Sequence, residues 1–208
     1  IVDGPPIVAE PQVRAARYSP CGQFLVAGGF DARVRRWGHI ANAWSELPSL
    51  EGHHGWVDGL AFETEKKLLF TADSWGQLRC MHDYAAALPT TVWCQPTAHD
   101  GWVRSLAMNS DGQLLASCGS DRVCRVWSVA DGKQRYCLAD YGRDLYRVIF
   151  APDGTLLTGD DRGLVKQWSL DGTLVREFDA TVLFAVSRLQ DVGGVQCLAI
   201  DRKGERLA

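Results

Sequence analysis

Residues 98–139 read AHDGWVRSLAMNSDGQLLASCGSDRVCRVWSVADGKQRYCLA, and this stretch decides the fold class. Short apolar segments alternate in it with turn signals, namely Asp-Gly at 111–112, Gly-Ser-Asp at 119–121 and Asp-Gly at 131–132. Asp-Gly pairs mark hairpin turns, because glycine adopts a positive φ without a Cβ clash. No segment of useful length has a helical period, so the stretch predicts four antiparallel strands.

The same order of signals recurs along the chain. An apolar residue, which we call the anchor, begins the first strand of each copy: Val13, Val57, Val103, Leu145 and Val195. The separations of 44, 46, 42 and 50 residues match the period of about 40–45 residues typical of four-stranded propeller blades. The predicted blades are 13–54, 55–98, 99–140 and 141–179, followed by a connecting insert at 180–194 and the start of another blade at 195–208.

These repeats resemble the WD40-repeat family almost from end to end. Gly52-His53 precedes a first strand, as in that family, and Trp37, Trp127 and Trp168 each close a third strand. The Asp that follows this Trp in the family is replaced by Gly38, Ser128 and Ser169. The resemblance implies an all-β propeller of four-stranded antiparallel blades.

Four blades and part of a fifth do not fill the seven-blade ring usual in the family. We therefore expect residues 1–208 to be a single propeller domain or part of one, an incomplete ring cut from a longer chain. Assembly of two incomplete rings is the alternative. The insert at 180–194 either extends the fourth strand into the packing of the next blade or forms an apolar lip that touches a partner.

The resemblance also implies a hydrogen-bonded structural tetrad in the third blade, formed by His99, Ser117, Asp121 and Trp127. These groups can satisfy one another, because Trp only donates, Ser donates and accepts, and an ionised Asp accepts. The other copies look incomplete. The second has His53 and Thr71 but Trp75 at the aspartate position. In the fourth, Asp161 aligns only with a shift.

The tetrad interpretation displaces two chemical ones. His53 and His99 hold the same position in different blades, so they should not converge on one zinc ion, and no Cys or acidic cluster completes a site. Ser117, His99 and Asp121 lack the G-x-S-x-G context of an activated nucleophile. The Gly-rich turns precede strands, whereas a phosphate cradle needs a helix N-terminus. We expect no catalytic residue, no metal and no cofactor.

The repeat does not account for the residues beside the anchors. In the family these positions lie on the top rim of the ring and commonly contact partners. The matching residues here are Trp56, Asp58, Trp102, Arg104, Asp144 and Tyr146, with the turn residues Trp75 and Arg122 as second candidates. Trp, Tyr and Arg dominate binding hot spots. The alternative is that the Trp rings merely cover blade edges.

The resulting expectation is a non-catalytic scaffold that binds proteins or peptides. The rival is a sensor or gating propeller of a larger enzyme, such as an ATPase, kinase or peptidase chain. The net charge of −3 offers no basic field for nucleic acid. No apolar run approaches the roughly 20 residues of a membrane span. The seven scattered cysteines, without C-x-x-C spacing, favour a reducing compartment, and thus the cytoplasm.

Overall fold

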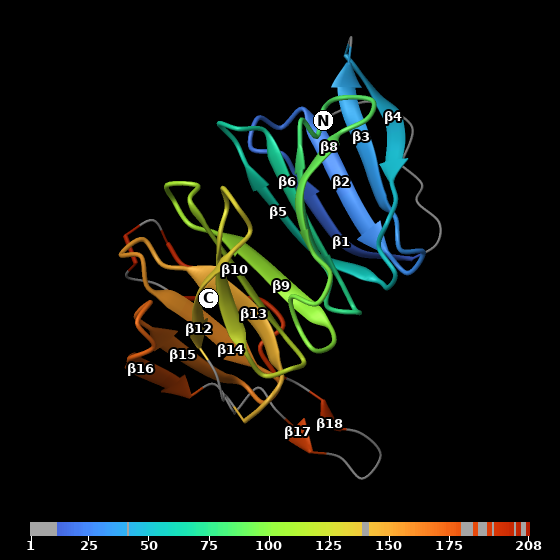
Figure 1. Ribbon diagram of the computed structural model, residues 1–208. Coiled ribbons are helices and arrows are strands. Elements are labelled where there is room, and N and C mark those ends of the chain that lie inside the picture. Colours follow the sequence, from blue (N-terminus) through green and yellow to red (C-terminus); the bar gives the residue numbers. More distant parts are fainter. Residues whose placement is uncertain are drawn as a thin grey trace. The chain divides into compact units, whose positions relative to one another are not determined.

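The computed structural model describes residues 12–40, 42–138, 142–179, 185–186, 191–192, 194–201, 203–204 and 207–208. The prediction of an all-β chain is confirmed, since the described residues form antiparallel strands and no helix (Figure 1). The chain divides into two compact units, Ile1–Ala98 and His99–Ala208. Each unit is described by itself.

The first unit contains two four-stranded sheets, the blades predicted around Val13 and Val57. The first blade is β1 (Val13–Tyr18), β2 (Phe24–Gly29), β3 (Val34–Ile40) and β4 (Ala43–Leu50). The second is β5 (Val57–Glu63), β6 (Leu68–Asp73), β7 (Leu78–His82) and β8 (Thr90–Gln95). In each sheet, strands adjacent in the sequence pair with one another.

The second unit repeats this arrangement twice. The third blade is β9 (Val103–Met108), β10 (Leu114–Gly119), β11 (Cys124–Ser128) and β12 (Gln134–Leu138). The fourth is β13 (Leu145–Phe150), β14 (Leu156–Asp160), β15 (Leu164–Trp168) and β16 (Leu174–Asp179). A short hairpin, β17 (Ala185–Val186) with β18 (Asp191–Val192), occupies part of the predicted insert. The rest of 180–193 lies outside the described residues.

Neighbouring blades within a unit pack through the anchors. Val57 is fully buried, and a Cβ added to Gly28 would lie 2.6 Å from a methyl group of Val57. Val195 makes the same approach to Gly159, where the corresponding distance is 2.4 Å. Glycine is therefore required on β2 and β14, because the anchor that follows lies against the backbone.

Residues 194–208 continue the pattern only in part. The backbone N–H of Val195 donates to the carbonyl of Asp160, and Ala199 and Ala208 exchange two backbone hydrogen bonds around the bridge between Ile200 and Leu207. This pairing is antiparallel, but it consists of a single isolated bridge. The assignment of 195–208 to a further blade stays a prediction, as does the treatment of the chain as one propeller domain.

Candidate functional site: the rim of the blades

Each blade carries a β-bulge immediately after its anchor. In the first blade Val13 pairs with Gly29 and Ala15 with Gly28, which leaves Arg14 as the extra residue. The same count leaves Asp58 unpaired in β5, Arg104 in β9 and Tyr146 in β13. A bulge bends the strand and turns the extra side chain away from the sheet's alternation. We call this end of each blade the rim.

In the first unit the rim residues form a compact cluster, which we call the unit 1 rim cluster. Arg14 donates from Nε and Nη2 to the two carboxylate oxygens of Asp58, both at 3.0 Å. The same guanidinium lies 5.3 Å from the ring centroid of Phe30. Phe30 meets Trp56 edge-on at 4.7 Å between centroids. Arg14 and Phe30 were missed in the sequence because neither carries a motif.

Trp75 extends this cluster at the following turn. The residue Trp75 is 70% exposed and Trp56 is 40% exposed, and the ring centroids of His54 and Trp75 lie 6.2 Å apart. The Oγ atom of Ser74 accepts from the backbone N–H of Trp56 at 2.9 Å, so the turn that holds Trp75 is fastened to the strand start. Two indole rings are thereby presented to water on one blade.

In the second unit the rim residues form a stack, which we call the unit 2 rim cluster. The guanidinium carbon of Arg104 lies 4.0 Å from the ring centroid of Trp102 and 4.6 Å from that of Tyr146. Arg122 approaches Asp144 at 3.9 Å. Cation–π contacts of this kind fix the plane of a guanidinium while leaving its charge in place. The structure thus brings Trp102, Arg104 and Tyr146 together, with Arg122 and Asp144 as a separate loose ion pair.

The third blade contains the hydrogen bonds expected of the tetrad. His99 donates from Nδ1 to Asp121 at 2.8 Å and accepts at Nε2 from the hydroxyl of Ser117 at 2.6 Å. The indole N–H of Trp127 donates to the same hydroxyl oxygen at 2.8 Å. Burial lowers the pKa of His99 despite the bond to Asp121, so the ring is neutral and each group is satisfied. Arg125, which the sequence did not indicate, adds a bond to Asp121.

The expectation that the second blade lacks the carboxylate is wrong. Asp73, two positions before Trp75, accepts from Nδ1 of His53 at 3.0 Å, while Thr71 donates to Nε2 at 2.7 Å. Burial opposes the ionisation of Asp73, but the bonds from His53 and from the Gln77 backbone hold its pKa at about 2. Motif alignment failed because the carboxylate comes from the end of the strand instead of from the turn.

The fourth blade uses the same earlier position. Asp160, and not Asp161, accepts from the backbone N–H groups of Arg162 and Leu164, at 2.9 and 2.8 Å. Trp168 donates from Nε1 to Thr158 at 3.2 Å. Tyr141, at the histidine position, lies outside the described residues. The hydrogen bonds accepted by Asp160 therefore close the turn between β14 and β15.

Other chemistry finds little support among the described residues. No group of three or more His, Cys, Asp or Glu is placed to hold a metal ion. No helix in the described part of the chain is long and apolar enough to cross a membrane. All seven cysteines are free, and burial raises the pKa values of Cys80 and Cys124 to about 12. These two thiols are unreactive at neutral pH.

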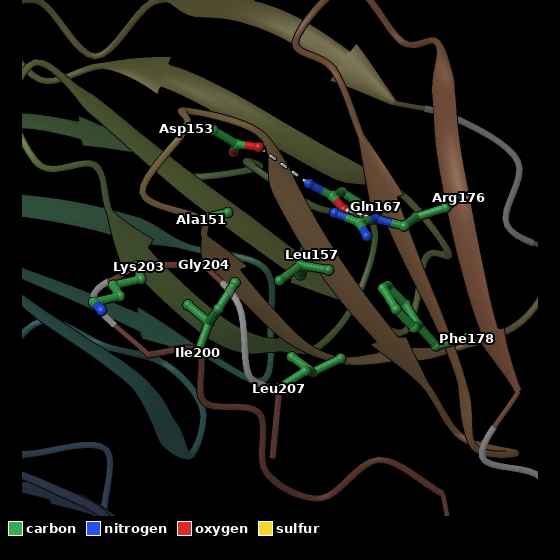
Figure 2. A pocket seen from close by; sticks show the side chains of 10 residues that line it. All are labelled: Ala151, Asp153, Leu157, Gln167, Arg176, Phe178, Ile200, Lys203, Gly204 and Leu207. Atoms are coloured by element: carbon green, nitrogen blue, oxygen red, sulfur yellow. Dashed lines mark hydrogen bonds between the residues drawn. The ribbon is translucent and has the colours of Figure 1, made fainter.

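A cavity of about 190 Å³ is lined by the fourth blade and by Ile200, Lys203, Gly204 and Leu207 of the C-terminal segment (Figure 2). Its base is apolar, with Leu157 and Phe178 among the lining side chains. Part of its polar lining is joined by hydrogen bonds: Arg176 donates from Nε to Gln167 at 2.5 Å, and Gln167 donates to Thr155 at 2.6 Å and toward Asp153 at 3.4 Å. The cavity contains no predicted site residue and presents no reactive group.

Comparisons with known proteins agree with the blade architecture. The family model described as "WD domain, G-beta repeat" matches residues 8–38 and 91–128. The chain is similar to Small ribosomal subunit protein RACK1z of Oryza sativa subsp. japonica, at 29% identity over 61% of this chain and 37% of that protein. It is also similar to human Apoptotic protease-activating factor 1, at 30% identity over 60% of this chain and 11% of that protein. The matched part is therefore well under half the length of these relatives.

Proposed function

This chain belongs to the WD40-repeat family, and from that premise we propose that it is a non-catalytic scaffold whose protein partner binds on the rim. The observation that carries the proposal is the presentation of Trp56 and Trp75 to water at one end of a blade, 40% and 70% exposed. Exposed aromatic rings beside fixed charges are typical of binding surfaces. The proposed contact residues are Trp56, Asp58, Trp75, Trp102, Arg104, Arg122, Asp144 and Tyr146.

The names of the relatives support a role in assemblies. RACK1z is named as a protein of the small ribosomal subunit, and Apoptotic protease-activating factor 1 is named for activating a protease. Neither name describes chemistry carried out by the repeats themselves. We propose that this chain likewise acts by holding another protein, in the cytoplasm, without binding nucleic acid or inserting into a membrane.

A second function has one observation in its favour. The match to Apoptotic protease-activating factor 1 covers 60% of this chain but only 11% of that relative, so repeats of this type occur inside much longer proteins. A sensor or gating propeller of a larger enzyme is the corresponding alternative.

We also propose that another blade packs on the first one. Strand β1 is largely exposed, including Val13 at 45% and Tyr18 at 61%, whereas β5, which holds the same place in the second blade, is largely buried. The rest of the same chain or a second copy would cover this face and complete the ring.

The test of rim binding is the double variant Trp102→Ala/Arg104→Ala in the full chain. Partner proteins captured by the unchanged chain and identified by mass spectrometry should be lost, while the free energy of unfolding changes little, because both side chains are partly exposed and neither belongs to the buried core. Leu88→Ala, at an 83% exposed site away from the rim, is the matched control and should retain capture. Undiminished capture by both Trp102→Ala/Arg104→Ala and Trp56→Ala/Trp75→Ala would refute the proposal.

A further inference from the structure

The four bulge residues form two pairs with different chemistry. Arg14 and Asp58 are the bulge residues of adjacent blades in the first unit, and Arg104 and Tyr146 are those of adjacent blades in the second. Arginine therefore occupies the same position in both units. Its neighbour on the next blade is a carboxylate in one case and a phenol ring in the other.

In the first unit the arginine is already neutralised. Both carboxylate oxygens of Asp58 accept from Arg14 at 3.0 Å, and the Asp58 side chain is only 10% exposed. The hydrogen bond to Asp58 raises the pKa of Arg14. This bidentate pair shows which ligand the bulge position accepts when one is available.

In the second unit the arginine has no such ligand. Among the described residues, no carboxylate lies within 4.0 Å of the Arg104 guanidinium, and its Nε–H is buried without a hydrogen-bond partner. The carboxylate of Asp144, another rim residue of this unit, approaches Arg122 at 3.9 Å. Arg104 therefore keeps its charge uncompensated on a partly exposed rim.

The stacking defines how a ligand can approach. The guanidinium carbon of Arg104 lies 4.0 Å from the ring centroid of Trp102 and 4.6 Å from that of Tyr146, so two aromatic rings lie against this group. The N–H groups of a guanidinium lie in its plane, and a carboxylate binds them edge-on. A fixed plane also reduces the side-chain entropy lost on binding.

We propose that Arg104 in the unit 2 rim cluster receives a carboxylate from an acidic segment of the partner protein. Because the Nε–H of Arg104 is buried and Tyr146 holds the bulge position that Asp58 holds beside Arg14, the Asp or Glu side chain of that segment binds the Nη groups of Arg104. Trp102 and Tyr146 then act as positioning residues that hold the guanidinium plane. This inference rests on the proposed function, because it assumes that a protein partner binds on the rim.

The experiment selects ligands from a displayed library of random 12-residue peptides against the full chain. Enriched peptides should contain Asp or Glu, and one of them, labelled for fluorescence anisotropy, should lose affinity when its acidic residue becomes the amide. The loss expected for Arg104→Gln is about tenfold to a hundredfold, the range for a charge-assisted hydrogen bond. Binding should also weaken as salt increases.

Two substitutions of Tyr146 provide the matched control. Tyr146→Asp places a carboxylate beside Arg104, as Asp58 lies beside Arg14, and should reduce binding of the acidic peptide at least tenfold more than Tyr146→Asn. The two variants have nearly the same size and both remove the ring, so the difference between them reports charge alone. Arg135→Gln removes an exposed guanidinium on β12, outside both rim clusters, and should leave the affinity unchanged.

The outcomes separate this inference from the proposed function. Enriched peptides without acidic residues, or equal binding by Tyr146→Asp and Tyr146→Asn, would overturn the inference, even where Trp102→Ala/Arg104→Ala still abolishes capture of the partner protein. Undiminished capture by that double variant would instead show that the partner does not bind the unit 2 rim cluster, and would overturn the inference with it.

Discussion

At the scale of single residues, Arg36 is the most consequential side chain in the first unit. It is 1% exposed and lies in β3, yet no carboxylate pairs with it among the described residues. Its guanidinium donates to the backbone carbonyls of Pro48, Tyr84, Ala86 and Ala87, at 2.6–3.1 Å. One arginine thereby fastens the loop between β7 and β8 to the first blade.

Arg36→Met should destabilise the protein strongly. Methionine fills a similar volume but leaves several buried carbonyl oxygens without donors, so we expect the free energy of unfolding to fall by about 3 kcal/mol. Urea unfolding at pH 7 measures the loss. Arg17→Met, at an exposed site on β1, should change stability by less than about 0.5 kcal/mol. Equal behaviour of the two variants would show that the loop is held by other contacts.

The sequence gives no indication of this role. Arg36 stands in RVRRW as one of three arginines, and a charged residue on a strand is ordinarily expected at the surface. The carbonyl groups that bind it come from residues 12 to 51 positions away. Only the packing of two blades brings them to one point.

At the scale of elements, the approach of one blade to the next depends on the absence of a side chain. Val57 lies against Gly28, and Val195 lies against Gly159. These glycines are ordinary members of strands by sequence, and Gly28 could equally have been attributed to the following turn. Their function is to let the anchor of the next blade reach the backbone.

Gly28→Ala should therefore be destabilising through overpacking. The added Cβ would lie 2.6 Å from both a methyl group and the carbonyl oxygen of Val57, and relief requires displacement of β5. We expect a loss of about 1–3 kcal/mol in the free energy of unfolding, measured in urea. In the double variant Gly28→Ala/Val57→Ala the loss should be smaller than the sum of the two single losses, because truncation removes part of the clash. Strict additivity would show that the two residues are not in contact.

The bulges are the second feature at this scale. Resemblance to the family pointed to the residues beside the anchors. Alternation along a strand predicts only that Arg14 and Asp58 lie on the other face of their sheets from the anchors. The register shift in each blade is what presents them at the rim. Bulges depend on strand pairing, which a single segment does not reveal.

At the scale of the whole molecule, a buried carboxylate–histidine pair recurs in the described part of each unit. Asp73 with His53 lies in the first unit and Asp121 with His99 in the second. Burial opposes ionisation of both carboxyl groups, but the hydrogen bonds they accept lower their pKa values from 3.8 to about 2. The native state therefore binds these protons less tightly than the unfolded chain does.

This linkage predicts the acid stability of the protein. Because the native pKa values are depressed, the stabilisation is complete above pH 4 and is lost as the pH falls toward 2. Burial lowers the pKa of His99. The protein therefore loses further stability as the pH falls below the ordinary histidine pKa of about 6.5. Asp73→Asn and Asp121→Ala should each lower the free energy of unfolding at pH 7 by about 1–3 kcal/mol. The difference in the free energy of unfolding between each variant and the unchanged chain should shrink toward pH 2.

Unfolding followed at several pH values tests this expectation. The exposed variant Glu65→Gln should track the unchanged chain throughout. A destabilisation by Asp121→Ala that is the same at pH 7 and pH 2 would show that the ionised form of this carboxyl group contributes nothing.

The sequence by itself determined the strands, their grouping into blades and the period of the repeat. These follow from apolar alternation and from glycine-containing turns, which act between residues close along the chain. It also placed the His99 tetrad, whose members stand at fixed offsets within one repeat. The tertiary structure alone decided that Asp73 serves His53, that Arg36 fastens a distant loop, and that Arg14 is neutralised whereas Arg104 is not. Those contacts join different strands or different blades, and their free energy depends on packing and register that no local pattern contains.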